Sequence, residues 1–334
     1  MHRTDEIINL SMNQYKDLEP APSVKFNTQI LDLDPDQLRE NIDIETTVEI
    51  ENTDTITASL DAIKEGYKPL ILNMANDYTP GGGFLTGAIA QEEHLFRCTN
   101  YFRTLTEGMY PIKRDEIIYS PKVHILKDAN YDNLDEPQSA AFVAVPAIQR
   151  PHLKFGQKLL PWDYSATFKK VNMIYQLGVI GNHDCLILGA LGCGAFRNPP
   201  QEIAKIFCSV TSQFVQKFKK IVFAVKCSDD NENCDVFKRT FLRTFTDEDQ
   251  GSSSESEQLT GDPYNPVSNS RADADADAGA GAGTGASGWE DACEDGCSNR
   301  EWEEWFDQDD PDIAELDPDD MEMLATMFGE DHIQ

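Results

Sequence analysis

The sequence predicts an α/β fold in which a mixed or parallel sheet is covered by helices on both faces. Short apolar runs with strand character alternate along the chain with segments of helical periodicity. Two central segments, PLILNM at 69–74 and CLILGAL at 185–191, are short and mainly apolar, as expected for strands with two buried faces. Ligands of such sheets bind at the carboxyl ends of strands, so the loops at 73–91 and 191–199 are the candidate binding loops.

The expected elements follow one another regularly from residue 46 onwards. A strand at 47–50 alternates apolar and polar residues, and a helix at 55–65 ends near Gly66. The other strands are expected at 69–74, 116–126, 140–147, 185–191 and 220–226. The other helices are expected at 87–105, 163–178, 200–218 and 235–244. Residues 1–45 are polar with only a weak helical stretch, and we interpret them as an N-terminal extension.

Charge divides the chain into two unlike parts. Its formal net charge is −31, of which −25 belongs to residues 246–334 and only −6 to residues 1–245. The first part is long enough for one well-buried core, and we expect the folded domain at 46–245. The second part is acidic and rich in Ser, Gly and Ala, so it predicts a largely disordered C-terminal tail.

The end of the tail leaves two interpretations open. Met321, Leu324 and Phe328 fall at helical spacing, which suggests a short helix at 319–329 that binds an unknown protein partner. A solvated tail with a few apolar residues is the favoured interpretation, because such short patterns arise readily by chance.

Composition argues against several classes of protein. The first 20 residues contain no long apolar run and no stretch is apolar enough to span a membrane, so neither a secretory signal nor a membrane anchor is expected. The acidic charge argues against direct nucleic-acid binding. The eight cysteines lack CxxC spacing and the six histidines are scattered, so we expect free thiols, no metal site and an intracellular protein of the cytoplasm or nucleus.

The first candidate motif is NMANDYTPGGGFLTGAIAQEEHLF, residues 73–96. Its three consecutive glycines follow a buried strand, allow positive φ and leave no side chain between backbone and ligand. Glu92 and Glu93 are adjacent on the following helix, so their side chains diverge by about 100°. One carboxyl group can protonate the leaving oxygen of a glycosidic bond while the other binds sugar hydroxyls or orients the loop. The apolar residues around the pair favour a site over an ordinary solvated helix face.

The second candidate motif is LGALGCGAFRNPPQE, residues 188–202. Its glycines lie between a strand and a helix that begins with two prolines, where exposed backbone N–H groups form an anion site. Phe196 can stack on a sugar or a base, with an ordinary core position as the alternative. Cys193 lies between Gly192 and Gly194, but no cationic residue or suitably placed histidine is evident, so we expect an inert thiol.

Taken together, PGGG, QEE and GALGCGAFRNPP resemble the microbial-type poly(ADP-ribose) glycohydrolase catalytic domain. The resemblance covers residues 46–228 and includes ENTDTITA and LILNMAND before the glycines, SPKVHILKD after them and IVFAVK near the end. It implies a macrodomain-like three-layer α/β/α fold with a central mixed sheet, and no metal or cofactor. It also implies a glycosidase that hydrolyses ADP-ribose O-glycosidic linkages, above all by exo cleavage of poly(ADP-ribose) that releases ADP-ribose. Its binding partners would then be ADP-ribose, the polymer or an ADP-ribosylated protein.

The resemblance also implies roles for single residues. Glu93 corresponds to the catalytic acid and Glu92 to the neighbour that contacts ribose hydroxyls. The residues that wrap, hold or support the scissile ribose are Asn76, Gly81, Gly82, Gly83 and Gln91. The residues of the diphosphate loop, in which Phe196 stacks on the substrate, are Gly192, Cys193, Gly194, Ala195 and Phe196.

The implied mechanism makes two demands on these loops. Glu93 must be protonated before it can donate to the leaving oxygen, and burial beneath the glycine loop would favour that form. A valine at Gly194 should weaken ADP-ribose binding, because it disfavours positive φ and covers the N–H groups.

Three alternatives remain open. One is a mono-ADP-ribosyl hydrolase that acts on protein or a nucleobase, because the motifs do not determine the leaving group. Another is a non-catalytic ADP-ribose reader, although a pure reader has no need of the second glutamate. The third and weakest is a scaffold whose function lies in the tail.

Overall fold

The computed structural model describes residues 2–28, 38, 41–42, 45–155, 157–227 and 232–247. The last helix among these residues is α7 (Asn233–Asp247). The expected disordered tail beyond this helix, and the helix expected at 319–329, lie outside the described residues.

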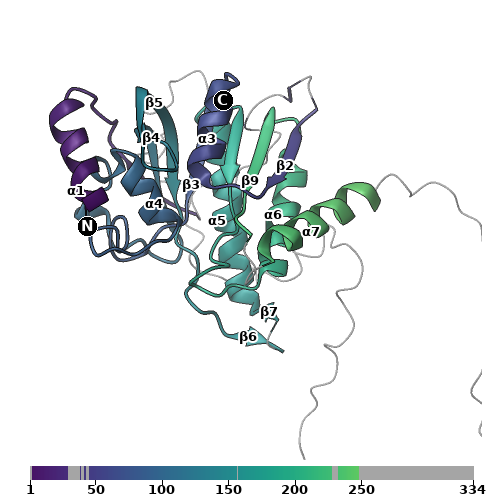
Figure 1. Cartoon of the computed structure of the whole chain (residues 1–334). Coiled ribbons are helices and arrows are strands. Elements are labelled where there is room, and N and C mark those ends of the chain that lie inside the picture. The colour runs from purple at the N-terminus through teal and green to yellow at the C-terminus, as the bar shows by residue number, and fades with distance from the viewer. Residues whose placement is uncertain are drawn as a thin grey trace, which may run out of the picture. The chain divides into compact units, whose positions relative to one another are not determined.

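Seven strands of the described chain form one mixed sheet (Figure 1). In chain order they are β1 (Val24–Asn27), β2 (Thr47–Glu51), β3 (Pro69–Asn73), β4 (Glu116–Lys127), β5 (Asn133–Ala144), β8 (Cys185–Leu188) and β9 (Lys220–Ala224). Their order across the sheet is β1-β4-β5-β3-β8-β9-β2. The pairs β1–β4 and β4–β5 are antiparallel and the remaining pairs are parallel, which confirms the predicted mixed sheet.

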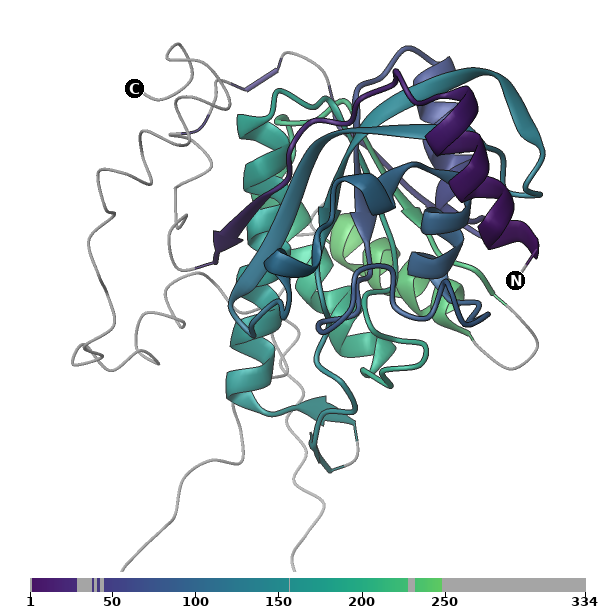
Figure 2. The same cartoon turned by 90° about the vertical axis from the view of Figure 1, so that its left-hand side faces the viewer.

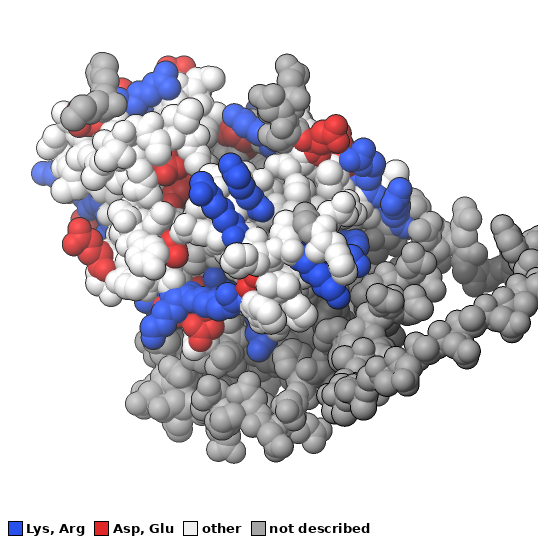
Figure 3. Space-filling model, turned by 90° about the horizontal axis from the view of Figure 1, so that it is seen from below, with Lys and Arg blue, Asp and Glu red and all other residues white. Residues whose placement is uncertain are grey.

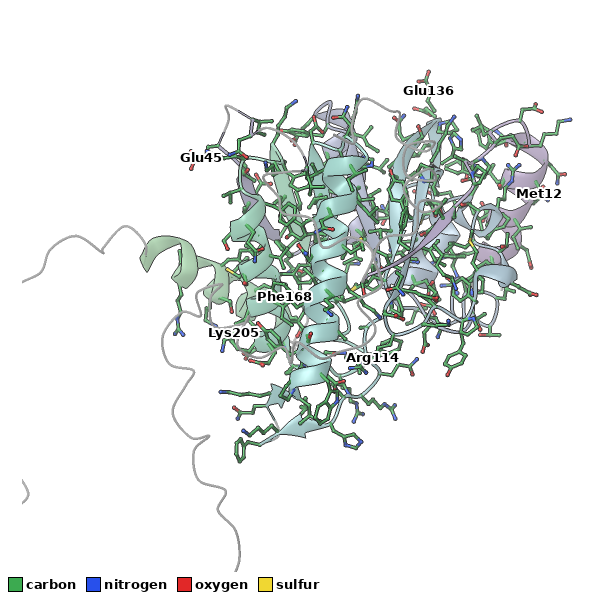
Figure 4. The ribbon with its side chains drawn as sticks, turned by 180° about the vertical axis from the view of Figure 1, so that it is seen from behind. Met12, Glu45, Arg114, Glu136, Phe168 and Lys205 are labelled. Carbon is green, nitrogen blue, oxygen red and sulfur yellow. The ribbon has the colours of Figure 1, made fainter. Side chains whose placement is uncertain are left out.

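Helices cover both faces of this sheet, as the sequence predicts (Figures 1 and 4). The helices are α3 (Thr55–Lys64) and α4 (Gln91–Cys98) on one face, and α5 (Pro161–Ile180), α6 (Pro200–Phe214) and α7 on the other. Leu70 of β3 packs with the second group, whereas its neighbour Ile71 packs with the first. Alternate residues of the central strands thus enter two separate cores, which explains why these strands are mainly apolar.

The N-terminal segment packs against the sheet and its helices. Helix α1 (His2–Asn9) continues as a π-helical turn, Leu10–Gln14, and lies beside α4 (Figures 1 and 2). Ile7 and Leu10 bury their side chains against Leu126 of β4. The chain then forms β1, the edge strand next to β4. The described part of the extension therefore contributes a strand and a helix to the fold.

The helix expected at 87–105 is shorter in the structure. It begins at Gln91, because the preceding residues form turns in which Ala88 N donates to Gly83 O at 3.1 Å. It ends at Cys98, because Thr99 is extended and forms a β-bridge with Ile125. The consequence is functional, since Glu92 and Glu93 fall in the first turn of α4, where the helix dipole favours negative charge.

A small antiparallel hairpin lies outside the main sheet, between β5 and α5. It pairs β6 (Leu153–Lys154) with β7 (Lys158–Leu159) and lies at the lower end of α5 in Figure 1. The elements expected from the sequence do not include this hairpin. Within the described part of the chain, no helix combines the length and the apolar character needed to cross a membrane.

Candidate active site

Three connections meet at the carboxyl edge of the sheet. They are residues 74–90 after β3, 145–152 after β5 and 189–199 after β8. The middle connection contacts both others, since Ala75 N donates to Val145 O at 3.1 Å and Arg150 N donates to Phe196 O at 2.7 Å. The two glycine motifs therefore lie at one edge of the sheet. Figure 3 views the molecule from this side, where Lys and Arg side chains spread across the centre with a few carboxylates between them.

The glycine loop is shaped by positive φ at two of its three glycines. Gly81 has φ +72° and Gly82 has φ +53°, a region that L side chains rarely adopt. A Cβ on Gly81 would collide with the ring of Phe96, and a Cβ on Gly83 would lie 2.7 Å from Ala88 Cβ. Each glycine is thus required by backbone conformation, by a close approach or by both.

Glu92 lies beneath this loop and is almost fully buried. Its Oε1 accepts from Asn73 Nδ2 and from Gly81 N, both at 3.2 Å, and its Oε2 accepts from Asn76 N at 2.6 Å. Burial raises the pKa of Glu92 to about 8, although the hydrogen bonds from Asn76 and Asn73 lower it. The same three hydrogen bonds fix the loop above Glu92 to the end of β3.

Glu93 is also buried but has different partners. Its Oε1 accepts from Gly83 N at 2.9 Å, and its Oε2 accepts from Ala90 N at 3.1 Å. The second bond caps α4, whose N-cap residue has no side-chain acceptor of its own. A Cβ on Gly82 would lie 2.6 Å from Glu93 Oε1, so this carboxyl group faces the underside of the glycine loop.

Glu92 and Glu93 lie at different places beneath the glycine loop. Glu92 lies against the buried end of β3 and the buried Gly81, whereas Glu93 lies under Gly82 and Gly83, which are half-buried. The protonated form that the implied mechanism requires at Glu93 stays a prediction.

Gln91 and Asn76 hold the two ends of the loop. The amide of Gln91 accepts from Met74 N at 2.9 Å and donates to Leu72 O at 2.7 Å, so it joins α4 to the end of β3. The Asn76 Oδ1 accepts from the backbone N–H groups of Tyr78 and Thr79. The Asn76 Nδ2 donates to none of the described residues and is therefore available to a ligand.

The second loop offers a row of backbone donors. Its turns use the N–H groups of Cys193, Arg197 and Asn198, which donate to backbone oxygens of the same loop. The N–H groups that find no acceptor among the described residues are those of Gly192, Gly194, Ala195 and Phe196. They precede the N-terminus of α6, so the loop has the geometry of an anion site.

Phe196 and Cys193, the two candidate side chains of this loop, are both half-buried but differ in chemistry. Phe196 adjoins the available N–H groups. Burial raises the pKa of the Cys193 thiol well above its usual range, so this sulfur stays protonated, as expected for an inert thiol. Neither residue is needed to explain the backbone shape, which rests on Gly192 at φ +73°.

Gly192, rather than Gly194, is the position where valine should have the larger effect. Gly194 has no positive φ, and a Cβ there would meet no atom within 4 Å. A Cβ on Gly192 would collide with the amide of Asn198 and lie 2.5 Å from Ala147 Cβ. We expect Gly192→Val to weaken ADP-ribose binding at least about tenfold and to lower the Tm, because it strains the backbone and separates the two connections.

Calorimetry and thermal unfolding of both valine variants test this expectation. Gly194→Val should keep the Tm of the parent chain, since its side chain extends into open space. Unchanged ADP-ribose affinity in a folded Gly192→Val chain would remove the anion-binding role from this loop.

Two buried cations, Arg97 and Lys170, donate hydrogen bonds to backbone carbonyls of the site's loops, and the sequence did not predict these contacts. The Nη2 of Arg97 donates to Phe84 O at 2.8 Å, and Thr4 Oγ1 of α1 donates to the same carbonyl at 2.9 Å. Lys170 of α5 donates to Pro146 O at 2.8 Å, and burial lowers its pKa to about 8. Sequence spacing gave no signal for either contact, because each joins residues that are distant in the chain.

Comparison with known proteins agrees with this geometry. The family described as the microbial-type PARG catalytic domain matches residues 11–128. No curated protein sequence matches the chain. The structure is similar to that of poly(ADP-ribose) glycohydrolase from Thermomonospora curvata, with 24% identity, a TM-score of 0.65, and coverage of 72% of this chain and 98% of that chain.

Two further solved structures have a higher sequence identity over a smaller part of this chain. The poly(ADP-ribose) glycohydrolase from Deinococcus radiodurans in complex with ADP-ribose has 26% identity and a TM-score of 0.57, over 67% of this chain and 94% of that chain. Another crystal form of that complex has 28% identity and a TM-score of 0.58, over 66% and 94%. The chain therefore resembles the microbial-type PARG catalytic domain in the sequence of residues 11–128 and in its described fold, which confirms the resemblance that the glycine motifs predict.

Proposed function

We propose that this chain is a poly(ADP-ribose) glycohydrolase that hydrolyses ADP-ribose O-glycosidic linkages from the end of the polymer. One observation carries the proposal. Two adjacent buried carboxyl groups, Glu92 and Glu93, lie directly beneath a glycine loop whose N–H groups they bind. The free thiols of the described cysteines support an intracellular location as part of the proposal.

Binding of the terminal ADP-ribose would use both loops. The diphosphate accepts hydrogen bonds from the N–H groups of Gly192, Gly194, Ala195 and Phe196, assisted by the positive end of the α6 dipole. The anomeric ribose lies under Gly82, where the Asn76 amide is available to its hydroxyls. Burial raises the pKa of Glu92 and so disfavours a second negative charge beside Glu93.

The chemical step is a hydrolysis with Glu93 as general acid and base. Its O–H donates a proton to the leaving oxygen while the anomeric C–O bond breaks and the ribose gains oxocarbenium character. A water adds to the anomeric carbon, and its proton passes to the Glu93 carboxylate, which restores the acid. The products are ADP-ribose and a polymer shortened by one unit.

One assay separates this function from its alternatives. Purified chain is incubated with poly(ADP-ribose) and, separately, with mono-ADP-ribosylated protein, and free ADP-ribose is measured by chromatography. Release from the polymer supports the proposal. Release only from the modified protein would assign the chain to mono-ADP-ribosyl hydrolases, and tight ADP-ribose binding without release from either substrate would make it a reader.

Activity is expected to survive chelation by EDTA. Among the described residues, no group of three or more His, Cys, Asp or Glu side chains could hold a metal ion, and the proposed mechanism uses only hydrogen bonds and an acid. The check compares initial rates with and without EDTA after dialysis. Loss of activity that magnesium restores would contradict the proposed chemistry.

A further inference from the structure

The connection between β5 and α5 has an unusual charge for this chain. Residues 137–162 contain three basic residues, Arg150, Lys154 and Lys158, and no Asp or Glu, in a sequence whose net charge is −31. All three are exposed, and no described carboxylate forms an ion pair with them. A fourth cation, Arg114, is half exposed; its Nη2 donates to Trp162 O at 3.0 Å and forms an ion pair with Asp163 Oδ1.

Two aromatic rings are exposed among these cations. Phe155 is 86% exposed and Trp162 is 62% exposed, although large apolar side chains are normally buried. The Lys154 ammonium lies 5.3 Å from the centre of the Phe155 ring. In Figure 4 the hairpin lies below the first turn of α5, near the labelled Arg114. Exposed rings between cations are the arrangement that binds stacked bases and phosphates.

The order of strands determines where this surface lies along the substrate. The diphosphate loop follows β8, the glycine loop follows β3, and the hairpin follows β5, the other neighbour of β3. A substrate whose diphosphate is bound after β8 and whose anomeric carbon lies after β3 continues in the same direction toward β5. The hairpin therefore lies on the side of the leaving group.

We infer that the hairpin surface, formed by Arg114, Arg150, Lys154, Phe155, Lys158 and Trp162, binds the ADP-ribose unit that leaves. The inference rests on the proposed function and assigns its substrate as a polymer. The leaving unit carries an adenine that stacks on Phe155 or Trp162 and a diphosphate that pairs with the lysines and arginines. The side chain that leaves from a mono-ADP-ribosylated protein offers neither an adenine nor a diphosphate.

Binding measured without turnover tests the surface independently of catalysis. The Glu93→Gln chain is titrated with an oligomer of two ADP-ribose units and with free ADP-ribose. We expect the oligomer to bind more tightly, and Phe155→Ala/Trp162→Ala or Lys154→Glu/Lys158→Glu to weaken oligomer binding about tenfold while ADP-ribose binding is retained. The charge-matched control is Lys64→Glu/Lys122→Glu, which alters two exposed lysines outside the hairpin and should leave both affinities unchanged.

Each outcome decides the proposal. Equal losses for oligomer and ADP-ribose, or no loss for either, would overturn it. A single-stranded oligonucleotide that binds the hairpin as tightly as the oligomer would also overturn it, because the surface would then recognise nucleic acid. Failure of the unmodified chain to release ADP-ribose from polymer would instead contradict the proposed function, even if oligomer binding depends on the hairpin.

Discussion

The Glu93→Gln chain is expected to bind ADP-ribose while releasing it from polymer about 10²–10⁴-fold more slowly, the usual contribution of a general acid or base. The amide keeps the size of the carboxyl group and can still accept the hydrogen bond from Gly83 N. It has no proton to give to the leaving oxygen. Steady-state rates on polymer and calorimetry with ADP-ribose measure the two effects separately.

Two further variants make this result specific. Glu107→Gln removes an exposed carboxylate outside the site and should keep the rate of the parent chain. Glu92→Gln replaces the carboxyl group with the raised pKa and should loosen the loop through its contacts to Gly81 and Asn76. If Glu92→Gln abolished turnover and Glu93→Gln retained it, the two roles would have to be exchanged.

Gly82→Ala is expected to lower kcat about a hundredfold, as misplacement of a catalytic group by about 1 Å does. The new Cβ would lie 2.6 Å from Glu93 Oε1 and 3.1 Å from Glu92 Oε2, so one methyl group displaces both carboxyl groups or the loop. The positive φ adds a strain of about 1–2 kcal/mol. Turnover and the unfolding free energy are measured on the same preparation.

The Gly87→Ala variant distinguishes the effect of backbone strain from the effect of contact with the two carboxyl groups. Gly87 belongs to the same loop and has φ +93°, but a Cβ there would meet no atom within 4 Å. The Gly87→Ala variant should therefore lower the free energy of unfolding, as Gly82→Ala does, but it should keep a kcat near that of the parent chain. Equal losses of kcat in both variants would show that backbone strain, and not contact with the carboxyl groups, controls the site.

Much of the fold and the composition of the site could be predicted because the signals are local. The strand at 69–74 is mainly apolar because neighbouring residues enter different cores, and the motif at 73–96 holds its glycines and carboxylates within one loop and one helical turn. The strand expected at 140–147 was misplaced. In the structure β5 is Asn133–Ala144, and its first half is polar because it is exposed and pairs with β4 alone.

What could not be predicted depends on residues distant in sequence. Positive φ at Gly192 rather than Gly194 follows from the approach of Ala147 and Asn198, which no local pattern encodes. The raised pKa of Glu92 follows from its depth beside β3, because desolvation is a property of the packed structure.

The shared carbonyl of Phe84 has a consequence for how the site opens. Since Thr4 of α1 and Arg97 of α4 both donate to this oxygen, the glycine loop cannot move away from α4 without also breaking its contact with the first helix. Loop and helix should therefore open as one cooperative unit, with similar amide hydrogen-exchange protection at Gly83 and in residues 2–9. Proteolytic trimming or a fused tag that frays α1 then acts on the catalytic loop, although neither touches a residue that binds substrate.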